Sequence, residues 1–234
     1  MFTASAELYD IIYSSFKDYA AEADRIAALL RSSHPACRSV LDVGCGTGEH
    51  VRLLMERGFE VQGLDLDPDL LKVAAKKNPA CRFHRADMCA FEIPDRFDAV
   101  LCLFSSIGYA TALERVVQAL CCFRRHLARG GIAVVEPWFT PDAIRPGHTT
   151  STTVEAPPLR ILRTSSMAVA GRTSRLTFEY EVTGPEGTKH ATELHELGLF
   201  TIDEMKGAFA EAGLAVTYDP EGLTGRGLYV GSAT

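Results

Sequence analysis

The sequence predicts an α/β protein whose main sheet is doubly wound and largely parallel. Five apolar strand-like runs alternate with helical runs over the first 138 residues, with short connections between them. A glycine-rich turn, GCGTG at 44–48, follows the first of these strands. After residue 138 several strand-like runs follow one another without helices, which predicts a small antiparallel β insertion after the fifth strand.

Apolar spacing and helix-end residues define the elements of the first part. Residues 6–31 carry apolar residues at helical spacing, and the run ends before Pro35. Asp67 and Pro68 have the types preferred at an N-cap and at the first helical position. Helices are therefore predicted at 6–31, 48–57, 67–77 and 111–128. Strands are predicted at 39–43, 60–66, 81–87, 97–104 and 132–138.

The remainder of the chain has a different pattern. Residues 139–158 are rich in Pro and Thr and are predicted to form a loop. Strand-like runs follow at 159–170, 173–183 and 188–200, and TIDE at 201–204 is a capping box that begins a helix. Two further strand-like runs, LAVTYD and RGLYVG, complete the pattern. We therefore expect one main domain, residues 1–138 and 201–234, that holds an antiparallel insertion at 139–200.

Charge and composition exclude several classes of function. The net charge of the 234 residues is −6, whereas non-specific nucleic-acid binding needs clustered Lys and Arg. The first residues lack the features of a signal peptide, and no apolar run reaches the ~18 residues of a membrane span. We expect a cytoplasmic protein with no nucleic-acid or membrane partner. The seven cysteines lack metal-site spacing, so no metal is expected.

The glycine turn and the strand ends indicate the kind of ligand. A dinucleotide fingerprint would place its third glycine at position 49, where this chain has Glu49, and that carboxylate would repel a diphosphate. A ligand with an ammonium group has no such conflict. Asp65 ends the second strand, where an acid can bind ribose hydroxyls, and Asp87 can face an adenine amino group. The alternative is that Asp42, Asp65 and Asp87 are only turn residues.

The stretches LDVGCGTGEH, GLDLD and RADM together resemble the class I S-adenosylmethionine-dependent methyltransferases. The resemblance covers residues 38–138 and 201–232 and implies a Rossmann-like seven-stranded sheet with a reversed last hairpin. It implies S-adenosylmethionine as cofactor, with S-adenosylhomocysteine as the product formed from it. The implied cofactor contacts are Tyr19, Asp42, Gly44, Gly46, Gly48, Asp65, Leu66, Asp87, Met88 and Phe104.

A narrower resemblance extends over nearly the whole chain. AELYD (6–10), KDYAAEA (17–23), FSSIG (104–108), VVEPW (134–138) and GRGLYVG (225–231) are similar to the TDP-amino-sugar N,N-dimethyltransferases of antibiotic pathways. The resemblance implies that the insertion covers a sugar-nucleotide pocket. The implied substrate contacts are Trp138, Arg163, Ser165 and Arg226. Three features depart from that branch: a histidine follows SSIG there and Tyr109 here, a tyrosine near the N-terminus is absent, with Phe2 the nearest aromatic, and EPWWFP there is EPWFTP here.

The candidate catalytic residues are Tyr109 and Glu136. An amino-sugar amine must lose a proton before methylation, which suits a histidine of pKa ~6.5 better than a tyrosine of pKa ~10. We therefore expect Tyr109 to position the amine by a hydrogen bond, with a packing aromatic as the alternative. Glu136 is expected to hold a substrate hydroxyl or ammonium, or else to be a structural partner of Arg226 or Lys17. His126 is expected to interact with a helix C-terminus, and His84, His148, His190 and His195 have no partner spacing that indicates a role.

Three functions remain open at this point. The first is N-methylation of a nucleotide-linked amino sugar, with a TDP-sugar as the small-molecule substrate. The second is O- or C-methylation of another natural product, which the changed residues at positions 109 and 2 favour. The third is S-adenosylmethionine binding without turnover. A homodimer is compatible with each of them.

Overall fold

The computed structural model describes residues 6–233, and its main sheet has seven strands in the order β10-β11-β5-β4-β1-β2-β3. Strand β11 runs antiparallel to both of its neighbours, β5 and β10, whereas the other neighbouring pairs are parallel. The strands are β1 (Ser39–Val43), β2 (Glu60–Asp65), β3 (Arg82–Arg85), β4 (Phe97–Cys102), β5 (Leu127–Val135), β10 (Leu214–Asp219) and β11 (Leu228–Ala233). The predicted sheet and its reversed last hairpin are confirmed.

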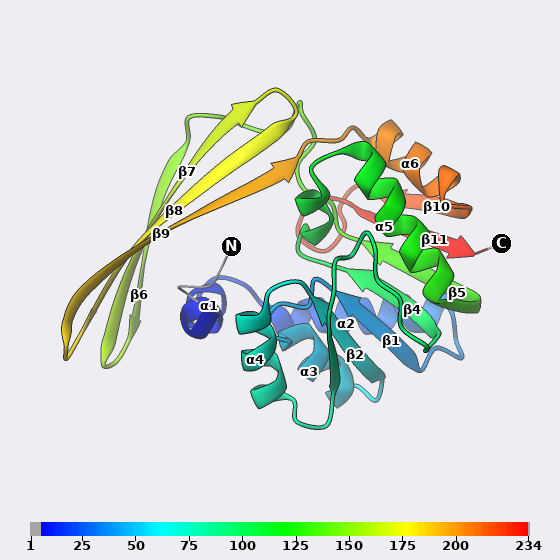
Figure 1. Cartoon of the computed structure of the whole chain (residues 1–234), viewed down its shortest axis with the longest axis horizontal. Coiled ribbons are helices and arrows are strands. Elements are labelled where there is room, and N and C mark those ends of the chain that lie inside the picture. Colours follow the sequence, from blue (N-terminus) through cyan, green and yellow to red (C-terminus); the bar gives the residue numbers. More distant parts are fainter. Residues whose placement is uncertain (1–5, 234) are drawn as a thin grey trace.

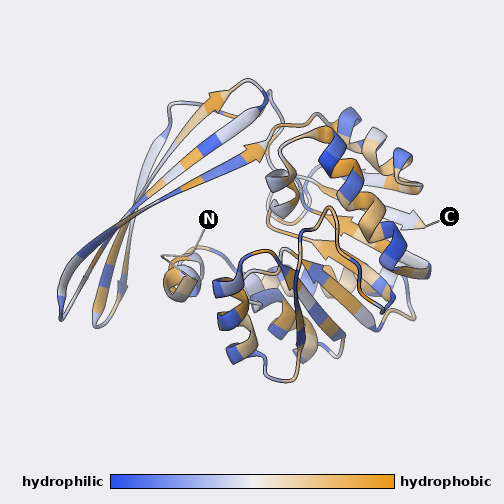
Figure 2. Ribbon diagram, viewed as in Figure 1, coloured by the Kyte–Doolittle hydropathy of each residue, from blue (hydrophilic) through white to orange (hydrophobic). Residues whose placement is uncertain are grey.

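Helices cover both faces of this sheet, because alternate strand residues point to opposite sides. In β4, Val100 and Cys102 pack in one apolar cluster with α5 and α6, and Ala99 and Leu101 pack in a second with α2 and α3. The helices are α1 (Ala6–Tyr13), α2 (Tyr19–Ser33), α3 (Glu49–Glu56), α4 (Pro68–Lys77), α5 (Leu113–His126) and α6 (Ile202–Glu211), with a 3₁₀ helix η2 (Ser106–Ala110) after β4. The central strands are apolar along most of their length, whereas α4 and α5 carry hydrophilic residues on their outer sides (Figure 2).

The N-terminal segment forms two helices where the sequence predicts one. The side chain of Asp18 accepts a hydrogen bond from the backbone N–H of Ala21, which makes Asp18 the N-cap of a new helix. The separated helix α1 lies between the insertion and α4 (Figure 1). Its Asp10 accepts hydrogen bonds from Thr47 Oγ1 at 2.5 Å and from Lys77 Nζ at 2.6 Å. Phe2 lies outside the described residues.

The insertion is an antiparallel sheet of four strands in the order β6-β7-β8-β9. Its strands are β6 (Thr149–Ala156), β7 (Leu159–Ala170), β8 (Thr173–Gly184) and β9 (Gly187–Gly198). Three of them match the prediction, but β6 lies within the segment predicted as a loop. Its β-branched residues favour a strand, and it pairs with β7 from Thr149–Ser166 to Ala156–Leu159. The loop predicted from the local richness in Pro and Thr is therefore wrong for residues 149–156, which form a strand.

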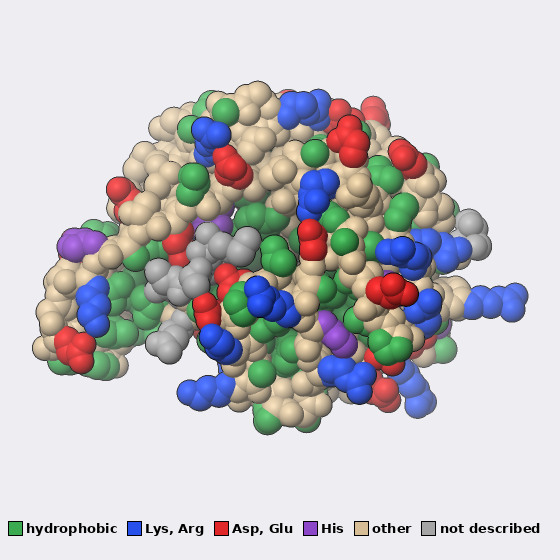
Figure 3. Space-filling view, viewed as in Figure 1, with side chains coloured by type: hydrophobic (Ala, Val, Ile, Leu, Met, Phe, Trp, Pro, Cys, Tyr) green, Lys and Arg blue, Asp and Glu red, His purple; other side chains and the backbone are tan. Residues whose placement is uncertain are grey.

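The arrangement brings five chain segments to one edge of the main sheet. The glycine turn follows β1, and the segments after β2, β3, β4 and β5 lie at the same carboxyl edge, where α/β proteins bind their ligands. The insertion and α1 extend over this edge (Figure 1). On the face shown in Figure 3, acidic and basic side chains are interspersed. No helix within residues 6–233 is long and apolar enough to cross a membrane.

Candidate active site

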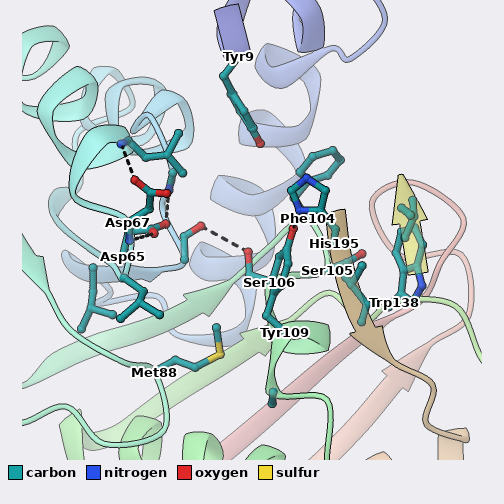
Figure 4. Close-up of a pocket in the computed structure, with 18 of the residues that line it drawn as sticks. Tyr9, Asp65, Asp67, Met88, Phe104, Ser105, Ser106, Tyr109, Trp138 and His195 are labelled. Carbon is teal, nitrogen blue, oxygen red and sulfur yellow. Dashed lines mark hydrogen bonds between the residues drawn. The ribbon is translucent and has the colours of Figure 1, made fainter. Parts of the chain in front are cut away.

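A cavity of about 420 Å³ lies at the carboxyl edge of the main sheet. Its floor is made by the glycine turn and the strand ends, and α1 and the insertion supply further walls through residues such as Tyr9, Arg163 and Phe178. Asp65 and Met88 lie toward one end and Trp138 toward the other, with Tyr109 and His195 between them (Figure 4). Its volume and its mixture of aromatic and polar walls suit a small-molecule ligand.

The glycine turn brings bare backbone to the cavity. Gly44 has φ +73°, and a Cβ there would lie 2.6 Å from Ser106, so the turn packs directly against η2. Gly46 has φ +54° and lines the cavity, and a Cβ there would meet nothing within 4 Å. Gly48 lines no described pocket. It packs between the turn and α4, where a Cβ would lie 2.9 Å from the side chain of Asn78.

Asp65 anchors the turn from the end of β2. Its Oδ2 accepts a 2.8 Å hydrogen bond from the N–H of Gly46, and its Oδ1 accepts one of 2.9 Å from the N–H of Asp67. Burial raises the pKa of this carboxyl group. Leu66 and Met88 line the cavity beside it, and Asp87 lies at the rim, where Arg115 donates a 2.9 Å hydrogen bond to it.

A narrow recess adjoins the cavity on the other side of the glycine turn. It is lined by Tyr19, Asp42 and His50, and it shares Gly44, Gly46 and Phe104 with the cavity. The Oδ2 atom of Asp42 is buried and has no hydrogen-bond partner among the described residues, and burial raises the pKa of Asp42 to about 6. An ammonium group in this recess would supply the missing donor and favour the carboxylate form.

The residues present therefore fit S-adenosylmethionine, a nucleoside with a methionyl ammonium group. Asp65 and Asp87 line the cavity, where carboxylates could accept hydrogen bonds from the ribose hydroxyls and the adenine amino group, and Asp42 and Tyr19 line the recess, where a buried carboxylate suits an ammonium group. Nine of the ten predicted cofactor contacts line the cavity or the recess, and Gly48 does not. Among the described residues, no group of His, Cys, Asp and Glu could hold a metal ion.

Glu136 is buried behind the cavity wall. It has no exposed surface and does not line the cavity. It accepts hydrogen bonds from the N–H of Phe104 at 2.7 Å, from Thr224 Oγ1 at 2.6 Å and from Arg226 Nη2 at 3.0 Å. The expected contact with a substrate group is thus replaced by the structural alternative, a pairing with Arg226. Lys17 pairs with Glu22 instead.

Two arginines, Arg163 and Arg226, line the cavity. The guanidinium carbon of Arg163 lies 5.1–5.3 Å from the ring centroids of three aromatic residues, Tyr13, Phe16 and Phe178. Its Nε and Nη1 are buried and have no partner among the described residues. Arg226 lies against Phe104 and Trp138, with its guanidinium carbon 5.4 and 6.0 Å from their ring centroids.

Trp138 and Ser165 differ in their relation to the cavity. Trp138 lines it, and its indole N–H donates a 2.9 Å hydrogen bond to Ser174 Oγ. Ser165 does not line it, because its hydroxyl lies 2.6 Å from Thr150 Oγ1 on the neighbouring strand β6. The predicted substrate contact of Ser165 is therefore replaced by a hydrogen bond between strands.

The hydroxyl of Tyr109 contacts His195, a residue whose spacing in the sequence indicates no role. The hydroxyl lies 2.9 Å from Nδ1 of His195, a residue of β9 that is only 3% exposed. On the far side of the imidazole, Nε2 lies 3.6 Å from Oε2 of Glu193, which also accepts a 3.2 Å hydrogen bond from Tyr180. The one signal in the sequence is polar residues at alternate positions of β9, on the side that the fold buries.

Comparison with known proteins agrees with this geometry. Residues 40–131 match the family model described as a methyltransferase domain. The chain is 41% identical to the dTDP-3-amino-3,6-dideoxy-alpha-D-glucopyranose N,N-dimethyltransferase of Streptomyces fradiae, over 97% of this chain and 89% of that protein. It is 38% identical to the dTDP-3-amino-3,4,6-trideoxy-alpha-D-glucopyranose N,N-dimethyltransferase of Streptomyces venezuelae, over 97% and 96%.

Solved structures give the same result. The crystal structure of DesVI from Streptomyces venezuelae matches with a TM-score of 0.93 and 38% identity, over 98% of each chain. An S-adenosylmethionine-bound amino pentose methyltransferase of calicheamicin biosynthesis from Micromonospora echinaspora matches with a TM-score of 0.89 and 33% identity, over 97% of each chain. The chain thus belongs to the class I S-adenosylmethionine-dependent methyltransferases, in the family of the TDP-amino-sugar N,N-dimethyltransferases.

Proposed function

We propose that this enzyme methylates the amino group of a TDP-linked amino sugar, adding up to two methyl groups. The observation that carries the proposal is the pair of arginines at the acceptor end of the cavity. Arg163 has two buried donors that find no partner within residues 6–233, and Arg226 is held beside Trp138. Guanidinium groups bind diphosphate oxygens in a bidentate manner, and the desolvation of Arg163 makes an anion there strongly favourable.

The rest of the cavity supports the same assignment. The insertion, residues 139–200, supplies Arg163, Phe178 and Leu197 to the cavity, so a sugar nucleotide bound there is covered by it. The relatives that match over nearly the whole chain are named for dTDP-amino sugars and for N,N-dimethylation. The aromatic rings packed around Arg163 restrict the space open to its guanidinium, which should lower the entropy cost of binding the diphosphate.

The chain contributes alignment and proton transfer to the reaction. S-adenosylmethionine, when bound, supplies an electrophilic methyl group on its sulfonium for the lone pair of the amine. Asp65 and the glycine turn fix the cofactor end of the cavity, and Arg163 and Arg226 fix the diphosphate end. Holding both ends brings the amine to one place, and such positioning is worth ~7–11 kcal/mol of the barrier.

The proposal is tested by ligand binding and by the mass of the product. In the presence of S-adenosylhomocysteine, we expect TDP to raise the melting temperature, and TDP-3-amino-3,6-dideoxyglucose to gain one and then two methyl groups on nitrogen. Inorganic diphosphate serves as the control for a general anion effect. Absence of any shift with TDP and with TDP-amino sugars would contradict the proposal, and methyl groups on oxygen or carbon would identify a different acceptor.

A further inference from the structure

We propose that Tyr109, His195 and Glu193 form a proton relay that takes the proton from the substrate ammonium. The inference rests on the proposed function, because it needs an amine as acceptor. It assigns a role to two residues of the insertion, one of which, His195, is buried beneath the tyrosine at the cavity wall. Figure 4 shows the phenol of Tyr109 beside the imidazole of His195.

The geometry of the three residues defines the tautomer of His195. Nε2 faces the carboxylate of Glu193 at 3.6 Å, and both side chains are almost fully buried, which favours the proton on Nε2. Nδ1 then carries the lone pair and accepts the hydrogen bond from the hydroxyl of Tyr109 at 2.9 Å. Donor and acceptor are thus arranged so that a proton can move from Tyr109 to His195.

A relay is needed because neither residue suffices alone. Both residues line the cavity, but His195 is only 3% exposed and its Nδ1 is occupied by the hydroxyl of Tyr109, whereas Tyr109 is 41% exposed. Burial raises the pKa of the Tyr109 hydroxyl, so a phenolate that could act as a base at neutral pH does not form. A neutral phenol can accept a proton from an ammonium only if it passes its own proton on at the same time.

The proton step balances in atoms and charge. One N–H bond of the ammonium breaks, its electron pair stays on nitrogen, and the proton goes to the oxygen of Tyr109. The original phenol proton moves to Nδ1 of His195. The products are a neutral amine, a neutral tyrosine and an imidazolium next to the Glu193 carboxylate, and the imidazolium returns its proton to solvent after product release. General base catalysis of this kind is worth ~100- to 10,000-fold in rate.

The described groups around His195 include a carboxylate and a guanidinium besides the tyrosines. The groups that face it are Glu193 from β9, Tyr109 from η2, Phe178 and Tyr180 from β8, Arg163 from β7 and Tyr13 from α1. Glu193 stabilises the imidazolium. The positive charge of Arg163 disfavours the imidazolium. It acts across the ring of Phe178, which packs against both residues. A diphosphate bound at Arg163 would weaken the repulsion between its guanidinium and the imidazolium of His195.

The main test is His195→Asn, whose amide can keep the hydrogen bond at the Nδ1 position but cannot take a proton. We expect kcat to fall at least ~100-fold at neutral pH with KM changed little, and the lost rate to return as the pH rises and the substrate amine is deprotonated in solution. His190→Asn, on the exposed side of the same strand, is the matched control and should behave as the wild type. Full activity with an unchanged pH profile in His195→Asn overturns the relay.

A second variant tests the direction of the relay. Tyr109→His places an imidazole directly at the cavity, so the double variant Tyr109→His, His195→Asn should recover most of the activity that His195→Asn loses. Failure of the double variant, when it still binds S-adenosylhomocysteine as the wild type does, counts against a base at this position. Binding of S-adenosylhomocysteine by calorimetry also shows that each variant is folded.

The tautomer gives a readout that does not depend on turnover. In a ¹⁵N-histidine spectrum of the S-adenosylhomocysteine complex, His195 should carry its proton on Nε2, and Tyr109→Phe should shift the Nδ1 resonance. A proton on Nδ1 overturns the relay even if the enzyme methylates amines. A wild-type enzyme that methylates no amine overturns the proposed function, whereas amine methylation unaffected by His195→Asn overturns the relay alone.

Discussion

The Nη2 atom of Arg226 donates a 3.0 Å hydrogen bond to Oε1 of Glu136, a carboxylate with no exposed surface. This bond joins the segment before β11 to the end of β5, two strands that are also paired in the sheet. Thr224 and the backbone of Phe104 donate to the same carboxylate. The position of Arg226 at the cavity wall is therefore determined by a residue that lies outside the cavity.

Glu136→Gln should destabilise the protein and displace Arg226. The amide removes the charge and places an N–H₂ group among three donors, and breaking a buried charge pair costs about 3 kcal/mol or more. Urea denaturation measures the loss. Glu155→Gln is the control, because Glu155 pairs with Arg160 at an exposed site, where such a pair is worth less than about 1 kcal/mol. Equal losses in the two variants would show that burial of the pair adds nothing.

Arg163→Lys should weaken TDP binding without weakening cofactor binding. Lysine cannot donate in the planar, bidentate manner of a guanidinium, and a charge-assisted hydrogen bond is worth about 1.5–3 kcal/mol, so affinity should fall about 10- to 100-fold. Isothermal titration calorimetry with TDP and with S-adenosylhomocysteine measures both effects. Arg160→Lys, exposed on the same strand, should leave both affinities unchanged. A parallel loss of both ligands in Arg163→Lys would indicate general misfolding of the cavity instead.

Asp42→Asn should stabilise the protein without ligand at neutral pH. Burial raises the pKa of Asp42 from an ordinary 3.8 to about 6, so the folded state holds this proton more tightly than the unfolded state. The contribution of this bound proton to the free energy of unfolding is fully present below pH ~4 and is lost as the pH rises through 6. At pH 7.5 the loss lowers the free energy of unfolding by roughly 3 kcal/mol. The gain from Asp42→Asn should therefore be large at pH 7.5 and shrink at pH 5. A gain that is the same at both pH values, measured by urea denaturation, would rule out titration of this carboxyl group.

Gly46→Ala should weaken cofactor binding at a small cost in stability. Gly46 and Gly130 both have positive φ, and a Cβ at either position would meet nothing within 4 Å, so alanine should cost about 1–2 kcal/mol at each. Only Gly46 lines the cavity, where the methyl group would occupy space needed by the cofactor. S-adenosylhomocysteine affinity should fall at least ~10-fold in Gly46→Ala and stay unchanged in Gly130→Ala. Equal affinities in the two variants would place the cofactor away from the turn.

The cofactor half of the site could be predicted because its signals are local. Asp42, the glycines and Asp65 belong to two strand ends and one turn, and the parallel topology places such ends at one edge. The acceptor half depends on pairings over long separations. Tyr109 and His195 are 86 residues apart, and only the register of β8 with β9 brings His195 to the cavity. Ser165 and β6 were misjudged for the same reason, since their partners lie on a neighbouring strand.

Helix α1 connects the two halves of the cavity. Ile12 packs with Ile161 and Phe178 of the insertion, and Asp10 is bonded to the glycine turn and to α4. Tyr9 and Tyr13 of the same helix line the cavity, so the cofactor part and the acceptor part share one wall. Exchange of S-adenosylhomocysteine for S-adenosylmethionine between two methylations should then displace this shared wall and open the acceptor part as well. Double methylation should therefore be distributive, with the monomethylated sugar accumulating in solution before the dimethylated one.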